Sequence, residues 1–304
     1  MMPAGRFAPS PSGELHLGNL RTALLAWLFA RSTGRQFLVR VEDLDRARAG
    51  AEEAQLRDLA AIGIGWDGPV VRQSERTELY EGALDALTDA GLTYECYCTR
   101  REIQEAPSAP HAPQGAYPGT CRDLTEAERG RRRAERPAAV RLRAGVTEGA
   151  VADVLHGRYV GLVDDFVLRR NDGVVAYNLA VVVDDAAQGV DQVIRGDDLL
   201  PSTPRQAYLA GLLGYAVPEY AHVPLVLNPQ GRRLAKRDGA VTLAALAAHG
   251  VPAERVAEIL LASLGLPRSL PAALEAFSAA ALPRDPWVLD PAELTARQER
   301  TLRS

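Results

Sequence analysis

A histidine, a glycine and an asparagine stand close together near the N-terminus, in a setting that suits phosphate binding. His16, Gly18 and Asn19 open a helical pattern that follows the Pro-, Ser- and Gly-rich turn at 9–13. Backbone N–H groups and the dipole at a helix N-terminus favour an anion. A histidine there can donate a hydrogen bond to a phosphate, and a glycine lets a flat group approach the helix. The same residues are also compatible with a plain strand-to-helix turn that carries a surface histidine.

A second cluster of charge lies far away in the sequence. Arg233, Lys236 and Arg237 stand on a short segment between Gly231 and Gly239, and the two glycines predict a loop. Three positive charges on five residues suit the triphosphate of ATP. A solvated surface loop is the alternative, because charge runs of this kind are common on protein surfaces.

The three cysteines of the chain fall within one stretch that is rich in Pro, Gly and Ala. Cys96, Cys98 and Cys121 supply soft sulfur donors, which suit tetrahedral zinc but leave a fourth ligand to be found. Tyr117 and His111 are the nearby candidates, and coordination chemistry by itself favours the histidine because tyrosine is an uncommon ligand. Three free thiols in a loop are the alternative to a metal site.

These residues must be positioned by a common scaffold, and the hydrophobic pattern predicts an α/β fold with a parallel sheet. A strand, a tight turn, a helix and a second strand follow one another at the N-terminus, which is the order of a βαβ unit. In an open parallel sheet, ligands bind in the crevice beyond the carboxyl ends of the strands. The pattern predicts strands at 6–8 and 36–41, helices at 16–32 and 204–213, two further helices within 50–95, β-rich runs at 140–143, 166–170, 177–183, 191–195 and 223–227, and helices from about 243 onward.

The overall composition is that of an ordinary globular protein: of 304 residues, 47% are hydrophobic and 24% are charged. The net charge of -4 means that RNA could bind only at a local basic patch. The sequence contains no apolar run of about 18 residues and no signal peptide, and its odd number of cysteines argues against a disulfide framework. We therefore expect a monomeric cytoplasmic protein that does not act at a membrane.

Together, the two phosphate-binding segments resemble the paired motifs of the class I aminoacyl-tRNA synthetases. His16–Asn19 stands where the HIGH motif belongs, and Arg233–Arg237 stands where the KMSKS motif belongs. Asn19 replaces the second histidine of HIGH, while Arg233 and Ala235 replace the first lysine and the first serine of KMSKS.

Four further stretches are similar to the glutamyl branch of this family: residues 6–13, 39–43, 177–185 and 193–200. The resemblance extends over about residues 5–245 and implies a Rossmann-like core with two reactions. The core makes glutamyl-adenylate and pyrophosphate from glutamate and ATP, and then transfers the glutamyl group to a hydroxyl of RNA. The resemblance implies catalytic roles for His16 and Lys236, and contacts to ATP, with its Mg²⁺, from His16, Gly18, Asn19 and Lys236.

The resemblance also implies a binding site for glutamate. Arg6 and Arg195 can pair with carboxylates, because a guanidinium binds them bidentately. Glu42 can pair with the ammonium group, Tyr177 can donate a hydrogen bond, and Ser10 lines the pocket. Arg195 and Glu42 could instead form a structural ion pair.

This family assignment divides the chain into four parts. Residues 1–95 and 186–243 form two halves of the Rossmann-like catalytic domain, 96–185 form an α+β insertion with the zinc site, and 244–304 form a helical C-terminal part. Within the insertion, the resemblance favours Tyr117 over the histidine as the fourth zinc ligand. The arginine-rich run 129–136 either holds an RNA backbone or forms a solvated helix face.

The expected acceptor of the glutamyl group is a modified base. The chain ends at Ser304 without the further helical domain with which ordinary glutamyl-tRNA synthetases read an anticodon. In this it resembles the glutamyl-queuosine tRNA(Asp) synthetases, as it does in Tyr117, Cys121 and the segment 202–206. That resemblance implies transfer of glutamate to queuosine-34 in the anticodon loop of tRNA(Asp). A truncated glutamyl-tRNA synthetase that charges the 3′ end of tRNA(Glu), and a catalytically inactive RNA- or zinc-binding module, are the alternatives.

Overall fold

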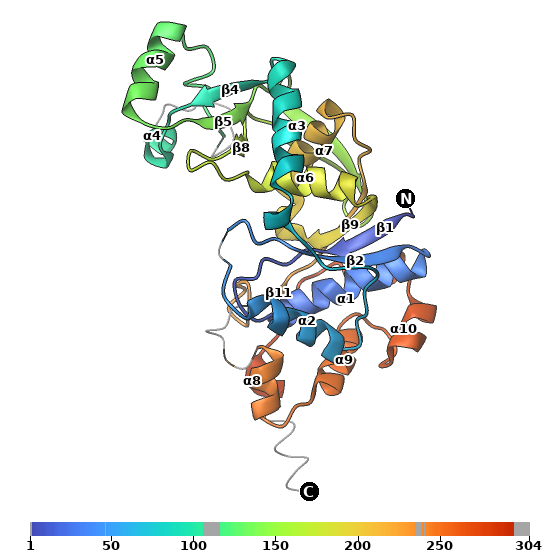
Figure 1. The fold of residues 1–304 in the computed structure, drawn as a ribbon. Helices are drawn as coiled ribbons and strands as arrows, with labels where there is room; N and C mark the ends of the chain where they lie inside the picture. The colour runs from blue at the N-terminus through green and yellow to red at the C-terminus, as the bar shows by residue number, and fades with distance from the viewer. Residues whose placement is uncertain (1, 46, 106–115, 235–238, 240, 295–304) are drawn as a thin grey trace, which may run out of the picture.

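A seven-stranded sheet lies at the centre of the fold in the computed structural model, which describes residues 2–45, 47–105, 116–234, 239 and 241–294 (Figure 1). All neighbouring strands run parallel except the last pair, β6 and β7. The sheet contains, in spatial order, β3 (Val71–Arg72), β2 (Gln36–Val41), β1 (Ala4–Phe7), β9 (Val190–Gly196), β10 (Glu219–Val223), β6 (Glu148–Asp153) and β7 (Gly157–Leu162). The predicted α/β fold with a parallel sheet is therefore confirmed.

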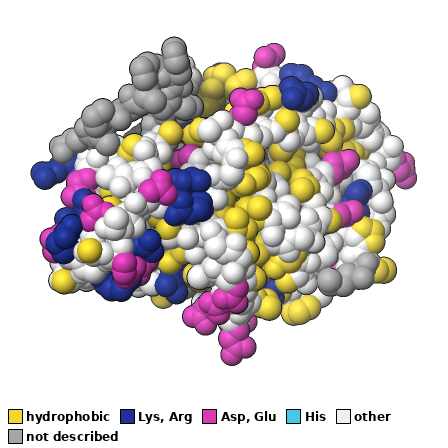
Figure 2. Space-filling model, turned by 90° about the horizontal axis from the view of Figure 1, so that it is seen from above, with side chains coloured by type: hydrophobic (Ala, Val, Ile, Leu, Met, Phe, Trp, Pro, Cys, Tyr) yellow, Lys and Arg dark blue, Asp and Glu magenta, His cyan; other side chains and the backbone are white. Residues whose placement is uncertain are grey.

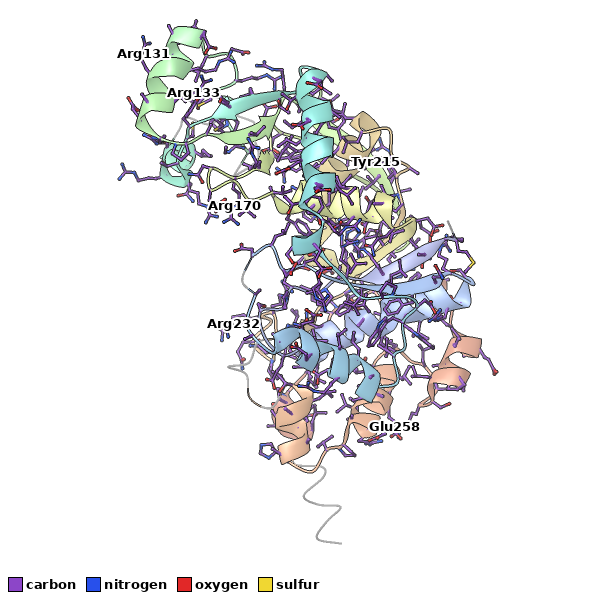
Figure 3. All side chains as sticks on the ribbon, in the orientation of Figure 1. Arg131, Arg133, Arg170, Tyr215, Arg232 and Glu258 are labelled. Atoms are coloured by element: carbon purple, nitrogen blue, oxygen red, sulfur yellow. The ribbon has the colours of Figure 1, made fainter. Side chains whose placement is uncertain are left out.

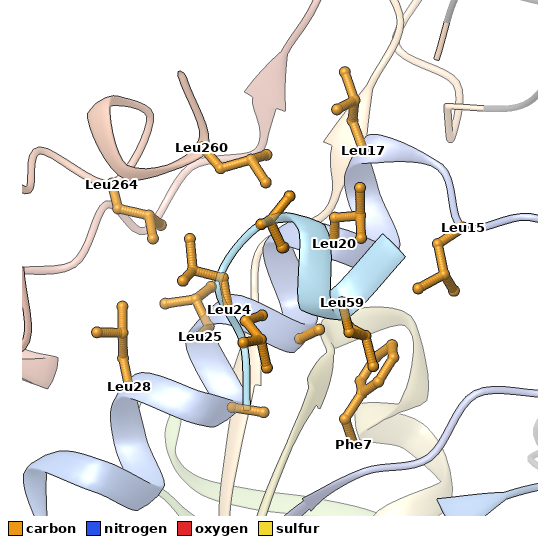
Figure 4. Close-up of a cluster of buried hydrophobic side chains, with 14 of the residues drawn as sticks. Phe7, Leu15, Leu17, Leu20, Leu24, Leu25, Leu28, Leu59, Leu260 and Leu264 are labelled. Atoms are coloured by element: carbon orange, nitrogen blue, oxygen red, sulfur yellow. The ribbon is translucent and has the colours of Figure 1, made fainter. Parts of the chain in front are cut away.

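One face of the sheet is covered by α1 (Leu17–Ser32), with α2 (Ala51–Ala61) and the C-terminal helices packed around it (Figure 1). Leucines at helical spacing fill the space beneath α1, and Leu20, Leu24 and Leu28 are at most 1% exposed. Figure 4 shows them in one cluster with leucines of α2 and of α9 (Ala253–Ala262). Each such burial contributes about 2 kcal/mol, and together they fix the N-terminus of α1 at the carboxyl end of β1.

The opposite face is covered by α3 (Thr77–Asp89), α6 (Tyr177–Ala187) and α7 (Thr203–Leu212) (Figure 1). Their apolar faces form a second core, in which Tyr80, Leu179 and Leu209 are all 0% exposed. The central sheet is thus buried between two layers of helices, as expected for a parallel sheet.

A three-stranded antiparallel sheet projects from the main body and forms an insertion lobe together with two helices (Figure 1). This lobe contains β4 (Thr93–Cys96), β5 (Ala139–Leu142), β8 (Val167–Arg169), α4 (Arg100–Glu105) and α5 (Glu126–Glu135). Strands β6 and β7 lie between β5 and β8 in the sequence, yet they extend the main sheet beyond β10. The segment 96–185 therefore contributes to both sheets.

The predicted β-rich run at 177–183 is wrong, because these residues form the start of α6. The run contains three consecutive valines, which favour a strand, but residues 179–185 are all buried among α3, α7 and the two sheets. A helix buried on nearly all sides has a continuous apolar sequence, so it lacks the period of 3.6 residues that would identify it.

The predicted strand at 223–227 is divided. β10 ends at Val223 and β11 (Val226–Leu227) begins after Pro224, which has no N–H to donate to a sheet. β11 pairs in parallel with β12 (Trp287–Val288), a short strand in the part predicted to be helical. The remaining elements are α8 (Leu243–Ala248), α10 (Leu270–Ala276) and short 3-10 turns at Gln73–Glu75, Asp197–Ser202 and Ala279–Ala281. Among the described helices, none combines the length and the apolar character needed to cross a membrane.

Candidate active site

A cavity of about 460 Å³ opens beyond the carboxyl ends of β1 and β9, beside the N-terminus of α1. This is the crevice in which ligands bind to open parallel sheets. Eight of the residues predicted to bind ATP or glutamate line it: Arg6, Ser10, His16, Gly18, Asn19, Glu42, Tyr177 and Arg195. Lys236 lies outside the described residues, but Arg233 on the same predicted loop lines the cavity. The roles of these residues stay predictions, while their common location is a property of the structure.

His16 is the N-cap residue of α1, and its side chain is held by Asn19. His16 Nδ1 accepts a hydrogen bond from the Asn19 backbone N–H at 3.2 Å, and Asn19 Oδ1 accepts one from the His16 N–H at 3.3 Å. This reciprocal pair is a capping box built from unusual residue types. Because Nδ1 is an acceptor, the proton of the neutral ring is on Nε2, which is the kind of donor that a phosphate oxygen needs.

Gly18 packs directly against the ring of His16. A Cβ atom at position 18 would lie 2.9 Å from His16 Cε1 and 3.0 Å from His16 Nδ1, which is closer than such contacts normally come. The absence of a side chain at position 18 therefore leaves space for the His16 ring. It also agrees with the expected close approach of a ligand.

The chain on either side of the basic loop is anchored beside the start of α1. The Leu17 backbone N–H donates to Val241 O at 2.9 Å, and Thr242 forms a β-bridge with His16. At the start of the loop, Arg233 forms an ion pair of 2.5 Å with Asp198, and both residues line the cavity beside α1. The two predicted phosphate-binding segments are thus neighbours in space although they are far apart in sequence.

Arg6 is buried, and its charge is paired inside the protein. Its Nε and Nη2 atoms donate to the carboxylate of Asp185 at 3.2 and 3.4 Å, and Arg40 Nη1 lies 2.8 Å from the same carboxylate. Burial by itself would raise the pKa of Asp185, but Arg6 and Arg40 hold that pKa below its usual range. Asp185 therefore stays ionised and fixes the guanidinium of Arg6 at the cavity wall.

Arg195 is also buried, but its hydrogen-bond partners are neutral. Its Nε donates to His222 Nε2 at 3.0 Å, its Nη2 donates to Thr203 Oγ1 at 2.9 Å, and its Nη1 donates to the Tyr177 hydroxyl at 3.4 Å. Within the part of the chain that the structure describes, Arg195 takes part in no ion pair. It therefore brings an uncompensated positive charge to the cavity, which suits a carboxylate ligand.

Glu42 faces the same cavity and is not paired with Arg195. Its carboxylate lies 3.7 Å from Arg40 Nη2, so the alternative of a structural ion pair between Arg195 and Glu42 does not describe this arrangement. Burial raises the pKa of Glu42, against the opposing effect of Arg40 and Arg6. A substrate ammonium group would supply a counter-charge and favour the ionised carboxylate.

Several residues that build the site were not predicted, among them Asp185, His222 and Gln55. The Gln55 side-chain amide of α2 donates to Ser10 O at 3.0 Å and to Gly13 O at 2.6 Å, which fixes the turn before α1. No local pattern marks Gln55 or His222. Asp185 belongs to an acidic doublet in an apolar segment, and because buried charges are rare unless paired, that doublet is a signal that could have found it.

A second cavity, of about 810 Å³, adjoins the first. Ser10, Ser12, Glu42 and Tyr177 line both cavities and form their shared wall. From this wall the second cavity extends into the insertion lobe, where its lining includes Cys96, Tyr97, Cys98, Arg136, Arg141 and Arg170. The predicted glutamate site is therefore open toward the insertion lobe.

The three cysteines converge in the insertion lobe. The Sγ atoms of Cys96, Cys98 and Cys121 lie within 4.8 Å of one another, so the cluster could hold a metal ion. The Tyr117 hydroxyl lies 3.3 Å from Cys96 Sγ and 3.6 Å from Cys98 Sγ. His111, the other candidate ligand, falls outside the described residues. Three thiols and a phenol that meet in a largely buried place are a donor set that fits zinc.

The surroundings of this cluster favour a thiolate. Hydrogen bonding with Cys121 lowers the pKa of Cys96 to about 4, with help from Tyr117 and although burial opposes the shift. The guanidinium of Arg141 lies 3.7 Å from the centre of the Tyr117 ring and adds a positive charge nearby. The same hydrogen bond raises the pKa of Cys121, so these surroundings favour one thiolate, on Cys96, and thiolates rather than thiols bind metal ions.

The arginine-rich run folds as the exposed helix α5 and its C-terminal cap. Three of its arginines are paired: Arg129 with Glu126 at 3.8 Å, Arg133 with Glu95 at 2.6 Å and Arg136 with Glu102 at 3.0 Å. Figure 2 shows acidic and basic side chains interspersed at this end of the molecule. These pairs are what a solvated helix face would contain, and RNA binding by the run stays a prediction.

The model for the catalytic domain of class I tRNA synthetases (E and Q) matches residues 4–277. The chain belongs to this family. The match extends from β1 to α10 and includes both cavities and the cysteine cluster. The family membership that the paired motifs predicted is therefore confirmed.

Several relatives within the synthetase family carry the name Glutamyl-Q tRNA(Asp) synthetase. The Glutamyl-Q tRNA(Asp) synthetase of Nocardia farcinica is 70% identical over 288 residues, which cover 94% of this chain and 93% of the relative. That of Symbiobacterium thermophilum is 48% identical and covers 97% of this chain and 98% of the relative. Among solved structures, a glutamate tRNA ligase from Elizabethkingia meningosepticum, in complex with its amino acid, superposes with a TM-score of 0.82 and 27% identity, over 99% of this chain and 70% of that chain.

Proposed function

We propose that this chain activates glutamate with ATP and transfers it to queuosine-34 in the anticodon loop of tRNA(Asp). The observation that carries the proposal is a single cavity that joins a helix N-terminus to Arg6, Arg195 and Glu42. A helix N-terminus suits phosphate, the arginines suit carboxylates, and the glutamate suits an ammonium group. ATP and an amino acid with two carboxylates need this combination, and the names of the close relatives support the choice of acceptor.

In the first step, an oxygen of the α-carboxylate of glutamate attacks the α-phosphorus of ATP. The bond from that phosphorus to the bridging oxygen breaks, pyrophosphate leaves, and glutamyl-adenylate remains. Negative charge moves toward the pyrophosphate, and His16 and Lys236 stabilise it by charge and hydrogen bonding. Mg²⁺ accompanies ATP as its counter-ion. The protein otherwise acts by holding the two substrates in contact.

In the second step, a hydroxyl of the cyclopentene diol of queuosine attacks the acyl carbon of the adenylate. An ester forms, and AMP and a proton are released. The second cavity is the route by which this base would enter, because it meets the first at Glu42 and Tyr177. Unpaired bases of an RNA loop can be splayed out and inserted into such a cavity.

We further propose that zinc binds to Cys96, Cys98, Tyr117 and Cys121. Four protein ligands leave no open position for a substrate, so the ion would be structural and would hold the insertion lobe together. No step of the reaction depends on it.

Incubation of the protein with labelled glutamate, ATP and bulk tRNA, followed by location of the label, tests the proposed function. We expect the label on queuosine-34 of tRNA(Asp). Label on the terminal adenosine of tRNA(Glu) would instead identify a glutamyl-tRNA synthetase, a second candidate favoured by the superposition on a glutamate tRNA ligase. If the protein shows no glutamate-dependent pyrophosphate exchange, it is an inactive RNA- or zinc-binding module.

A further inference from the structure

Three neighbouring strands carry a row of buried side chains that leads to Arg195. Asp153 is the last residue of β6, His222 is in β10 and Arg195 is in β9. These strands are adjacent in the sheet, and His222 and Arg195 are direct partners in register. The three residues are 4%, 0% and 5% exposed, in that order, and Arg195 is the member that reaches the cavity.

Hydrogen bonds connect the three side chains of this row, and each bond has a defined donor and acceptor. His222 Nδ1 lies 2.6 Å from Asp153 Oδ2, and His222 Nε2 lies 3.0 Å from Arg195 Nε. A guanidinium N–H is always a donor, so His222 Nε2 must accept. The imidazole proton is then on Nδ1, where it donates to Asp153, and the geometry assigns this one tautomer to His222.

Further contacts hold both ends of the row. The Asp153 carboxylate accepts backbone N–H groups from the turn at 155–156, at 2.9 Å each, and from His222 at 3.0 Å. At the other end, Thr203 Oγ1 accepts from Arg195 Nη2 at 2.9 Å. Burial by itself would raise the pKa of Asp153, but its hydrogen bonds with His222 and with the turn at 155–156 lower that pKa and keep the carboxylate ionised. Burial lowers the pKa of His222, which keeps the ring neutral.

The two buried arginines of the cavity, Arg6 and Arg195, are held in different ways. The carboxylate of Asp185 contacts Arg6 directly and offsets its charge. Arg195 is held by a neutral imidazole and a hydroxyl, and the carboxylate of Asp153 stands one side chain further away. Because attraction between charges falls with distance, Arg195 keeps more of its charge for a ligand.

We propose that Asp153 and His222 are positioning residues for glutamate binding, which orient Arg195 without neutralising it. Because Nε and Nη2 are both tied to the protein, the guanidinium plane has one orientation, in which Nη1 lies beside Tyr177 at the cavity. Arg195 then presents a fixed, charged edge to a carboxylate of the substrate. The inference rests on the proposed function, since it explains how the proposed glutamate site is built.

Glutamate titration by calorimetry and steady-state pyrophosphate exchange test the role of His222. His222→Leu removes the acceptor for Arg195. We expect Kd and KM for glutamate to rise at least about tenfold, which is a change of about 1.4 kcal/mol, while kcat and KM for ATP change less than about threefold. His222→Gln, whose Oε1 can accept from Arg195, should recover part of the loss.

Thr203→Val provides a second test with little change of side-chain shape. It removes the hydroxyl that accepts from Arg195 Nη2 and should weaken glutamate binding in the same selective way. His156→Leu is the matched control, because His156 Nε2 contacts the backbone oxygen of His222, at 3.0 Å, rather than a side chain of the row. Its Kd for glutamate should stay within about twofold, a difference smaller than half a kcal/mol.

A double-mutant cycle separates positioning from a general structural effect. In Arg195→Lys the planar fork is absent, so adding His222→Leu should change glutamate affinity by less than about twofold. An equal effect in both backgrounds, or unchanged affinity in folded His222→Leu and Thr203→Val, would overturn the inference. If the unaltered protein binds no glutamate, the proposed function itself fails, which is a distinguishable result.

Discussion

At the scale of single residues, we expect the ionised carboxylate of Glu42 to favour glutamate binding and to lower the stability of the empty protein. Burial raises the pKa of this carboxyl, so the folded protein holds the proton more tightly than the unfolded chain does. The stability that arises from this difference is fully present below the ordinary pKa of a glutamate and is lost as pH rises through the raised value. At neutral pH, the ionised form of Glu42 therefore costs stability in the empty site.

Replacing Glu42 with glutamine removes the charge and keeps the shape. We expect the melting temperature at pH 7 to stay equal or to rise, while Kd for glutamate rises at least about tenfold because the ammonium group loses its counter-charge. Scanning calorimetry and glutamate titration measure the two quantities. Glu52→Gln is the control, since Glu52 pairs with Arg72 outside the cavity, and it should leave glutamate affinity unchanged. A lower melting temperature with unchanged affinity would contradict the assignment.

Lys236 is predicted to act on the leaving pyrophosphate. Lys236→Ala should slow glutamate-dependent pyrophosphate exchange at least about tenfold, or about 1.4 kcal/mol of transition-state stabilisation. Exchange should proceed in the absence of RNA, because the cavity already holds the predicted glutamate contacts. Arg232→Ala is the matched control on the same loop, since Arg232 is exposed and points away from the body in Figure 3. An unchanged exchange rate in Lys236→Ala would remove this lysine from the mechanism.

At the scale of elements, the first turn of α1 couples packing to chemistry. Gly18→Ala would place a Cβ atom 2.9 Å from the ring of His16, so the ring must move. We expect the exchange rate to fall at least about tenfold, while the free energy of unfolding changes by less than about 1 kcal/mol because alanine also favours the helix.

The matched control for this substitution is Gly82→Ala in α3, where a Cβ atom would meet nothing within 4 Å. It should raise the free energy of unfolding by about 0.5–1 kcal/mol and leave the exchange rate unchanged. Exchange at the normal rate in Gly18→Ala would show that the position of the His16 ring does not matter for the reaction.

We predict that a zinc ion in the cysteine cluster stabilises the insertion lobe. Protein purified without chelator should contain one zinc ion per chain, and removal of the ion should lower the melting temperature. Tyr117→Phe keeps the ring against Arg141 and removes the hydroxyl, so it should weaken zinc retention. Elemental analysis measures the metal content of each protein. If Tyr117→Phe retains zinc and His111→Ala loses it, the histidine is the fourth ligand.

The sequence predicts those parts of the fold and of the site that short sequence patterns mark, and not those that depend on which distant segments become neighbours. The helix α1 is marked by Leu20, Leu24 and Leu28 at helical spacing, whereas the valines of α6 follow no such period. The cavity residues were found through their resemblance to family motifs. Asp153 and His222 could not be predicted as a pair, because they are 69 residues apart in the sequence and meet only when β6 joins the sheet beside β10. No local pattern states which strands become neighbours.

At the scale of the whole molecule, the main body and the insertion lobe both border the second cavity. In Figure 3, Arg170 lies on the insertion-lobe side and Arg232 on the main body, both toward the same edge. Arg170 also lines the second cavity. Since the chain carries a net charge of -4, any RNA must be held by such local basic side chains, and its binding should weaken as salt rises.

A short anticodon stem-loop that bears queuosine-34 should be a sufficient substrate. The second cavity adjoins the proposed glutamate site, and a loop base can enter it without the rest of the tRNA. The same stem-loop with guanosine should accept no glutamate, because it lacks the diol. Labelled glutamate and gel analysis measure both. Charging of unmodified tRNA(Glu) at its 3′ end, with none on the queuosine stem-loop, would favour the glutamyl-tRNA synthetase alternative.

The same four side chains, those of Ser10, Ser12, Glu42 and Tyr177, border both cavities. In the proposed reaction, an activated glutamyl group in the first cavity would therefore lie next to whatever fills the second cavity. With RNA bound, that would be a nucleoside hydroxyl. Without RNA it would be water, which would then be the competing acceptor. When the modified RNA is scarce, the lifetime of the adenylate against hydrolysis, rather than the speed of its formation, decides how much ATP is consumed in an idle cycle.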